Sequence, residues 1–232
     1  MAKKEVSALI AAIDPYVAAL LGRISEGKRV ISIQKGKRIF SQGDRADAIY
    51  FVQSGTVKVS VLSSAGREAV LAILGPRQFF GEGALVGQSV RVSTATAVQR
   101  ATLFQVERRA MLRALHDQAE LSEKFMGFLL ARNIDLEEDL CDQLFNHSEK
   151  RFARVLLKLA CLREHDLVAD ATIPLLRHEI LAEMVGTTRS RINHFMNKFR
   201  KMGLIDYNGG LIVRTELLTD VVFCMIESAA RR

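Results

Sequence analysis

Side chains suited to nucleic-acid chemistry gather in the segment from Thr188 to Lys201. This segment has five basic residues and no acidic one. A solvated helix face usually mixes both signs, because opposite charges one turn apart stabilise each other. A helix that enters the major groove of DNA cannot carry carboxylates against the phosphates. We therefore predict a DNA-reading helix, whose candidate contacts are Thr188, Arg189, Ser190, Arg191, Asn193, His194, Asn197 and Lys201.

Three small or apolar residues stand at the relative positions that a helix-turn-helix requires, namely Ala182, Gly186 and Ile192. The small side chain of Ala182 lets two helices cross closely, and Gly186 can take the positive φ of a tight turn. A hydroxyl of Thr187 or Thr188 can cap the second helix. The alternative interpretation is a plain three-helix packing unit with a basic surface.

Apolar residues predict which face of the second helix is buried, and a hairpin follows it. The spacing i, i+3, i+4, i+7 predicts a buried stripe of Ile192, Phe195, Met196 and Phe199. Residues 204–213 hold two apolar runs around Asn208-Gly209, a strong hairpin signal. We interpret this hairpin as a wing beside the DNA-reading helix.

The first half of the chain has a different pattern of apolar residues and glycines. Residues 5–26 show helical spacing of apolar side chains, and short runs rich in Val, Ile and Phe then alternate with glycines up to about residue 107. Short strands with frequent turn signals indicate an all-β sandwich or barrel. The predicted strands include Arg29–Ile33, Ala48–Val52, Thr56–Leu62 and Ala69–Leu74.

Residues 108–147 contain one glycine and no proline, and we predict a single long helix there. Helices longer than a small domain needs commonly pair with a copy of themselves, so the chain is expected to form a homodimer. The alternative is a spine that packs only within one chain. The predicted seam between two copies consists of Phe125, Leu129, Leu136 and Leu140.

Composition excludes several classes of protein. The net charge is +7, which alone is weak evidence for a nucleic-acid partner. No apolar run could span a membrane and the N-terminus lacks a signal-peptide pattern, so a cytoplasmic protein is expected. Cys141, Cys161 and Cys224 are too far apart for a metal or iron–sulfur site. The five histidines form no nucleophile–base constellation, which argues against an enzyme.

The chain from about residue 29 to 220 resembles the cyclic-AMP receptor protein / fumarate–nitrate reductase regulator (CRP/FNR) family of bacterial transcription factors. The markers are the helix-turn-helix and Gly36, Gly43-Asp44, Tyr50 to Gly55, Phe80 to Leu85 and Arg91. The resemblance implies an α+β fold, with a cyclic-nucleotide-binding β-roll, a central dimerisation helix and a winged helix-turn-helix. The corresponding regions are residues 1–107, 108–147 and 148–232.

The resemblance also implies an effector site. A glutamate matching Glu82 bonds the ribose 2′-hydroxyl, and an arginine matching Arg91, nine residues on, pairs with the cyclic phosphate. The implied effector is a cyclic nucleotide, cAMP or cGMP. The full set of candidate effector residues is Gly81, Glu82, Gly83, Ala84, Arg91, Val92, Leu136 and Glu137.

Several positions depart from the cyclic-AMP prototype of the family. Val92 replaces a serine beside the phosphate, and Leu136 and Glu137 replace hydroxyl residues at the adenine. Base recognition is therefore expected to differ. On the DNA-reading helix Ser190 and His194 replace a glutamate and an arginine, so the DNA site is also expected to differ.

Two readings of the function stay open at this point. One is a ligand-gated regulator that binds a two-fold symmetric double-stranded DNA site and has RNA polymerase as a further partner. The other is a constitutive regulator whose β-roll is only a dimerisation scaffold or senses a non-nucleotide effector. The amino-acid pattern does not separate activator from repressor.

Overall fold

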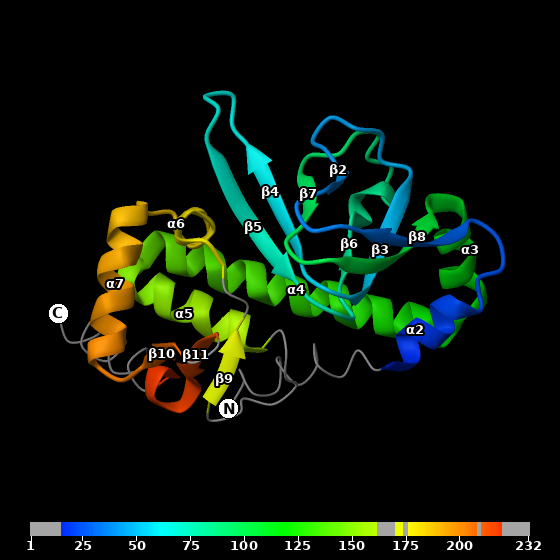
Figure 1. The fold of residues 1–232 in the computed structure, drawn as a ribbon. Coiled ribbons are helices and arrows are strands. Elements are labelled where there is room, and N and C mark those ends of the chain that lie inside the picture. Colours follow the sequence, from blue (N-terminus) through cyan, green and yellow to red (C-terminus); the bar gives the residue numbers. More distant parts are fainter. Residues whose placement is uncertain (1–14, 162–169, 174–175, 208–209, 220–232) are drawn as a thin grey trace. The chain divides into compact units, whose positions relative to one another are not determined.

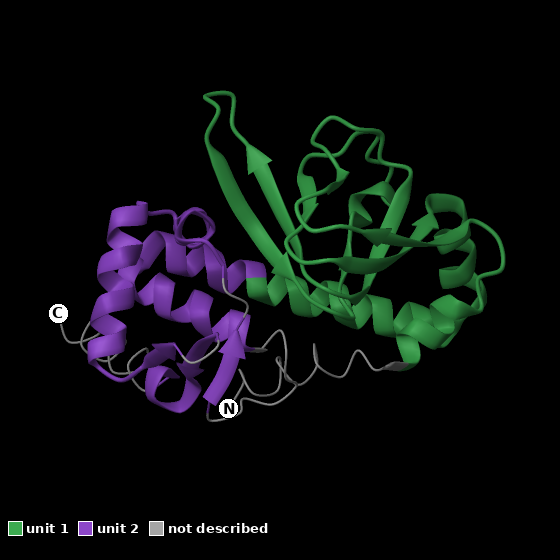
Figure 2. Cartoon of the chain, in the orientation of Figure 1, with its two compact units in different colours: residues 1–135 green, residues 136–232 purple. Residues whose placement is uncertain are grey.

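The computed structural model describes residues 15–161, 170–173, 176–207 and 210–219 (Figure 1). The chain divides into two compact units, residues 1–135 and residues 136–232 (Figure 2). Each unit has its own core, and each is described by itself.

The first unit is built on two four-stranded antiparallel sheets, ordered β1-β8-β3-β6 and β2-β7-β4-β5. The two sheets share one apolar core, which includes Tyr50, Val52 and Leu103 from one sheet and Val57 and Ala95 from the other. All four of the predicted runs named above are strands. The strands are β1 (Lys28–Ile33), β2 (Arg38–Phe40), β3 (Ala48–Ser54), β4 (Val57–Leu62), β5 (Glu68–Leu74), β6 (Phe79–Phe80), β7 (Thr94–Ala97) and β8 (Ala101–Glu107).

A second core of the first unit lies between the sheet that contains β3 and three helices: α2 (Pro15–Gly22), α3 (Arg108–Asp117) and α4 (Ala119–Phe145). Helix α2 lies within the predicted helical region 5–26, of which residues 5–14 are outside the described residues. In this core the ring of Phe79 on the sheet meets those of Phe125 and Phe128 on α4, and the ring of Phe51 packs against Phe79. The first turns of α4 therefore belong to the sensor-side unit.

The predicted long helix is present as α4, but it begins at Ala119 and not at Arg108, because the chain breaks at Gln118. This residue has φ −120° and ψ 92°, and its backbone N–H bonds the carbonyl of Ala114 to end α3. The break lets both helices bury an apolar face in the same core, Met111 from α3 and Leu121 from α4. Because this break is caused by packing, it needs no glycine or proline. The sequence therefore carries no local signal for it.

The predicted seam also needs a correction. Phe125 is only 6% exposed, and its ring meets that of Phe79 edge-on at 5.1 Å between centroids. It is therefore part of the core of a single chain and is not available to a second copy. Leu129, Leu136 and Leu140 of the predicted seam are exposed on α4.

The second unit combines the end of α4 with three helices and one antiparallel sheet. The helices are α5 (Ser148–Cys161), α6 (His178–Val185) and α7 (Arg189–Lys201), as the predicted succession of helices requires. The sheet has the order β10-β11-β9. Its strands are β9 (Asp170–Ile173), β10 (Ile205–Tyr207) and β11 (Leu211–Arg214), of which β9 was not predicted.

The predicted hairpin pairs as an antiparallel ladder, with Ile205 opposite Val213 and Tyr207 opposite Leu211. Its turn residues, Asn208 and Gly209, lie outside the described residues. Within the described part of the chain, no helix is both long and apolar enough to cross a membrane. The same described residues hold no cluster of three side chains that could bind a metal ion.

The burial of Phe125 makes a testable prediction about stability. Phe125→Ala should lower the free energy of unfolding by about 3–5 kcal/mol, because it leaves a cavity among aromatic rings. Leu112→Ala on α3, where the side chain is exposed, is the matched control and should have a much smaller effect. Denaturant unfolding measures both, and equal effects of the two substitutions would contradict this placement of Phe125.

Candidate functional site

The turn between α6 and α7 has the predicted geometry. Gly186 has φ 67° and ψ 48°, and its backbone N–H bonds the carbonyl of Ala182 to end α6. Helix α7 begins after Thr188, whose Oγ1 accepts a hydrogen bond from the backbone N–H of Arg191 at 3.3 Å. The prediction of the turn glycine is confirmed, and Thr188 is the capping threonine.

The buried face of α7 is the predicted one. Ile192, Phe195, Met196 and Phe199 are all buried. The ring of Phe152 on α5 stacks with Phe195 and Phe199, with centroids 5.9 Å and 5.4 Å apart. The opposite face is exposed at each predicted DNA contact, which are Thr188, Arg189, Ser190, Arg191, Asn193, His194, Asn197 and Lys201.

Two of the basic side chains of α7 have acidic partners on other helices. Arg189 Nε lies 3.2 Å from Glu179 Oε1 on α6, and Lys198 Nζ lies 2.7 Å from Glu149 Oε1 on α5. The net positive charge at the exposed face of α7 is thus smaller than the basic residues of α7 alone indicate. A hydrogen bond from its own backbone and then the nearby positive charges hold the pKa of Glu179 below its ordinary value. Glu179 therefore stays ionised beside Arg189 at neutral pH.

A second side chain of α6 contacts the exposed face of α7. The ring nitrogen Nδ1 of His178 hydrogen-bonds Oδ1 of Asn193, across fifteen residues of sequence. Neither His178 nor Glu179 was among the predicted site residues. Both contacts join neighbouring helices, and the pattern of α7 by itself carries no signal for them.

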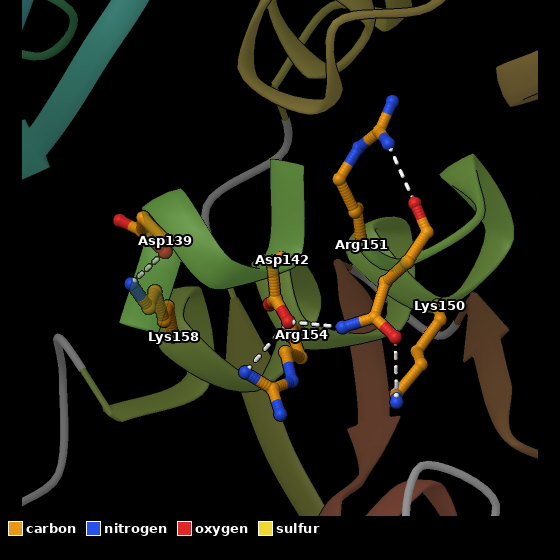
Figure 3. A network of polar contacts seen from close by, with 7 residues as sticks. Asp139, Asp142, Lys150, Arg151, Arg154 and Lys158 are labelled. Atoms are coloured by element: carbon orange, nitrogen blue, oxygen red, sulfur yellow. Dashed lines mark hydrogen bonds and ion pairs between the residues drawn. The ribbon is translucent and has the colours of Figure 1, made fainter. Parts of the chain in front are cut away.

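A network of polar contacts fixes the turn between α4 and α5 (Figure 3). Arg154 Nη1 lies 2.9 Å from the buried carboxylate of Asp142, which also accepts from Asn146 Nδ2 at 2.6 Å. Arg151 donates to the backbone carbonyls of Asn146 at 2.7 Å and Val185 at 2.9 Å. The guanidinium of Arg151 therefore ties the helix-turn-helix to the start of α5.

A cavity of about 530 Å³ lies between the start of α5, the Gly186 turn and α7. Unpaired N–H groups at the start of a helix attract anions, and in α5 the N–H groups of Lys150 and Arg151 already bond the carbonyl of His147. Arg191 and His194 face the same cavity from α7. The cavity lining is Asn146, His147, Ser148, Glu149, Arg151, Gly186, Arg191, His194 and Phe195.

In the first unit the predicted effector residues gather at the end of β6. Gly81 has φ 78°, and a Cβ on it would lie 2.6 Å from Nη1 of Arg91. A Cβ on Gly83 would lie 2.1 Å from Oε1 of Gln88. Gly81 is therefore required by its positive φ and by the buried Arg91, whereas the end of the flexible Gln88 side chain could move away from a Cβ on Gly83.

Arg91 is 4% exposed and is held from several sides. It donates to the carbonyls of Gly81 at 3.0 Å and Ala48 at 2.5 Å, and its guanidinium carbon lies 4.4 Å from the ring centroid of Phe40. Its Nε is buried without a hydrogen-bond partner. Burial raises the pKa of the adjacent Tyr50, although the charge of Arg91 opposes that shift.

Glu82 lies in the short 3-10 helix η1 (Glu82–Ala84), and its Oε1 is 3.6 Å from Nε of Arg132 on α4. Arg132 was not predicted as a site residue. Its position one helical turn before Leu136 is the signal that could have identified it.

The other four predicted effector residues are Ala84, Val92, Leu136 and Glu137. The side chain of Ala84 is fully buried, so only its backbone could contact a ligand. Val92 is exposed and has no hydroxyl to offer. Leu136 and Glu137 lie in the second unit and are exposed, and their part in an effector site stays a prediction. The structure brings together Gly81, Glu82, Gly83 and Arg91.

Models of two protein families match the chain. The model described as "Cyclic nucleotide-binding domain" matches residues 30–118, and the model described as "Crp-like helix-turn-helix domain" matches residues 150–220. The cyclic AMP receptor protein of Thermus thermophilus is 34% identical over 82% of this chain and 86% of its own length. This chain belongs to the CRP/FNR family. The predicted family and its α+β fold class are therefore confirmed.

Other relatives agree with this assignment. The CRP-like cAMP-activated global transcriptional regulator of Mycobacterium tuberculosis is 29% identical over 77% of this chain and 80% of the relative. The solved structure of FixK2 from Bradyrhizobium japonicum has the same fold, with a TM-score of 0.68 and 20% identity, over 83% of this chain and 96% of that one. As a member of this family, the chain is a DNA-binding transcription regulator with an N-terminal sensor domain.

Proposed function

We propose that the CRP/FNR-family chain binds a two-fold symmetric DNA site as a homodimer in the cytoplasm, with a cyclic nucleotide as its effector. The observation that carries the proposal is the sorting of α7 into a buried apolar face and an exposed polar face without acidic residues. Such a face suits the major groove, where the first residues of a recognition helix reach base edges. RNA polymerase stays a predicted further partner.

The cavity beside α7 supports a DNA backbone contact. Arg191 and His194 line it together with Ser148 at the start of α5. A phosphate oxygen there would accept from the permanent cation of Arg191, while the carboxylate of Glu149 in the same lining is paired with Lys198. Contacts of this kind set the register of the protein on DNA and carry no base preference.

An exposed apolar stripe on α4 supports the homodimer. Met126, Leu129, Leu136 and Leu140 are exposed and follow steps of three, seven and four residues. Apolar residues at such spacing on a long helix are covered in coiled coils by the same residues of a second helix. We therefore propose this set as the seam, with Met126 in place of Phe125.

The effector site has features that suit a cyclic phosphate. The unpartnered Nε of Arg91 is a buried donor, and unsatisfied buried donors are costly unless a ligand bonds them. Glu82 offers a carboxylate for a sugar hydroxyl. Relatives are named for cyclic AMP, and a matched Xanthomonas campestris regulator for cyclic di-GMP. Among cyclic nucleotides, cAMP and cGMP are the first candidates.

A second candidate function follows from the other contacts of Arg91. Two of its terminal nitrogens already bond the backbone carbonyls of Ala48 and Gly81, and it packs on Phe40. These contacts are what a structural arginine makes. They favour the alternative in which the β-roll is a scaffold and the regulator needs no nucleotide.

The recognition helix leads to a prediction about DNA. Paired α7 helices should bind half-sites whose centres lie about 34 Å apart, one turn of the duplex. Arg189→Ala should cost about 1–3 kcal/mol at one base pair in each half-site. Lys201→Ala should weaken all sequences alike and flatten the salt dependence. Selection of bound DNA followed by affinity titration tests this, and asymmetric or sequence-independent binding would contradict it.

The seam leads to a prediction about assembly. Leu136→Glu should break the dimer, because a carboxylate would be buried against its symmetry mate at a cost of several kcal/mol. Leu112→Glu, at an exposed position on α3, should leave the dimer intact. Sedimentation at micromolar concentration measures both variants. A wild-type monomer, or an undisturbed dimer of Leu136→Glu, would overturn the proposed seam.

The effector site leads to a calorimetric prediction. Wild type should bind cAMP or cGMP at submillimolar concentration, and Arg91→Ala and Glu82→Gln should both weaken this binding. Thermal unfolding of each variant separates lost binding from lost folding, since Arg91 is buried and Glu82 is partly exposed. No heat with either nucleotide, together with tight DNA binding by the ligand-free protein, would instead support the scaffold function.

A further inference from the structure

The first turn of α6 holds two side chains of the reading face of α7. Glu179 pairs with Arg189, and His178 bonds Asn193. Figure 1 shows α6 and α7 as consecutive helices of one unit. Consecutive residues of one helix therefore position residues four apart on the next, before any DNA is bound.

We propose that His178 is a positioning residue that sets which base edge Asn193 reads. The proposal rests on the proposed function, in which the exposed face of α7 lies in the major groove. His178 is half-buried at the start of α6, whereas Asn193 is exposed on α7. The hydrogen bond between them thus joins the supporting helix to the reading surface.

The chemistry of the carboxamide makes this contact decisive. A free asparagine reads adenine with both ends of its side chain, because Oδ1 accepts from N6 while Nδ2 donates to N7. In this protein Oδ1 of Asn193 accepts from Nδ1 of His178. This bond occupies one of the two lone pairs of Oδ1 and fixes the direction of the oxygen, which disfavours the two-ended contact with adenine. The N–H groups of Nδ2 then dominate what the side chain offers to the groove. Donors alone match acceptors, which are O6 and N7 of guanine, O4 of thymine and N7 of adenine, and adenine then loses the second of its two contacts.

The pair of Glu179 and Arg189 also fixes a side chain of α7 before DNA binds. Glu179 engages Nε of Arg189 and leaves the two terminal nitrogens for a base. Those nitrogens form the fork that bonds O6 and N7 of guanine. Two reading side chains held by α6 lose less rotamer freedom on binding than free ones would. The base preference is then determined by α6 and α7 together and not by α7 alone.

The test measures the affinity of the full-length dimer for its selected DNA site and for all four base pairs at one position. Asn193→Ala identifies that position, as the one where its base preference is lost. Wild type should prefer guanine or thymine there. His178→Phe keeps a ring at the site and removes the donor, so the ratio of affinities should shift toward adenine by about tenfold, the size of one good base contact.

Two control variants make the result specific. His178→Gln retains an N–H donor and should keep the wild-type ranking of bases. His116→Phe makes the same chemical change at an exposed position of α3 and should alter nothing. If His178→Phe changes affinity for all bases equally, or if wild type already prefers adenine at this position, the proposal is wrong. If wild type shows no base preference anywhere, the proposed function fails and not only the role of His178.

Discussion

Burial of one face of α7 is the constraint on which the DNA-binding half of this protein depends. Phe195 and Phe199 stack against Phe152 of α5, and Ile192 is fully enclosed. Large apolar side chains contribute roughly 1.5–3 kcal/mol each when buried. Because the helix cannot rotate without exposing them, the polar side chains on its other face point in one direction. A specific site on DNA requires such a fixed direction, since a misdirected donor loses its base contact.

The supporting contacts refine what this burial begins. Glu179 and His178 hold the side chains of Arg189 and Asn193 on α7. Arg151 holds the backbone of the turn through the carbonyl of Val185. Rotamers that are fixed in advance cost less entropy when DNA binds. If α7 enters the major groove as proposed, its affinity and selectivity depend on residues of α6 and α5 as well as on its own.

The sensor half is organised around a buried cation. Arg91 sits between backbone carbonyls and the aromatic rings of Phe40 and Tyr50, with one donor unbonded. This arrangement satisfies most of the guanidinium within the protein and leaves its buried Nε–H without a partner. The contact of Glu82 with Arg132 links the same loop to α4. A ligand that competes for Glu82 would therefore act on the helix as well as on the loop, and its effect would equal its differential affinity for the two arrangements.

The amino-acid sequence by itself determined the features that arise within one element or one turn. The strands of the β-roll, the buried stripe of α7, the Gly186 turn and a threonine cap after it all follow from spacing and from local backbone preferences, and the structure selects Thr188 over Thr187 for the cap. The break at Gln118, the burial of Phe125 and the pairs Glu179–Arg189, His178–Asn193 and Glu82–Arg132 did not follow. Periodicity states that a face is apolar, but not whether the chain itself or a second copy covers it. Only tertiary packing decided those contacts, because each joins residues that approach only when separate elements bury their apolar faces together.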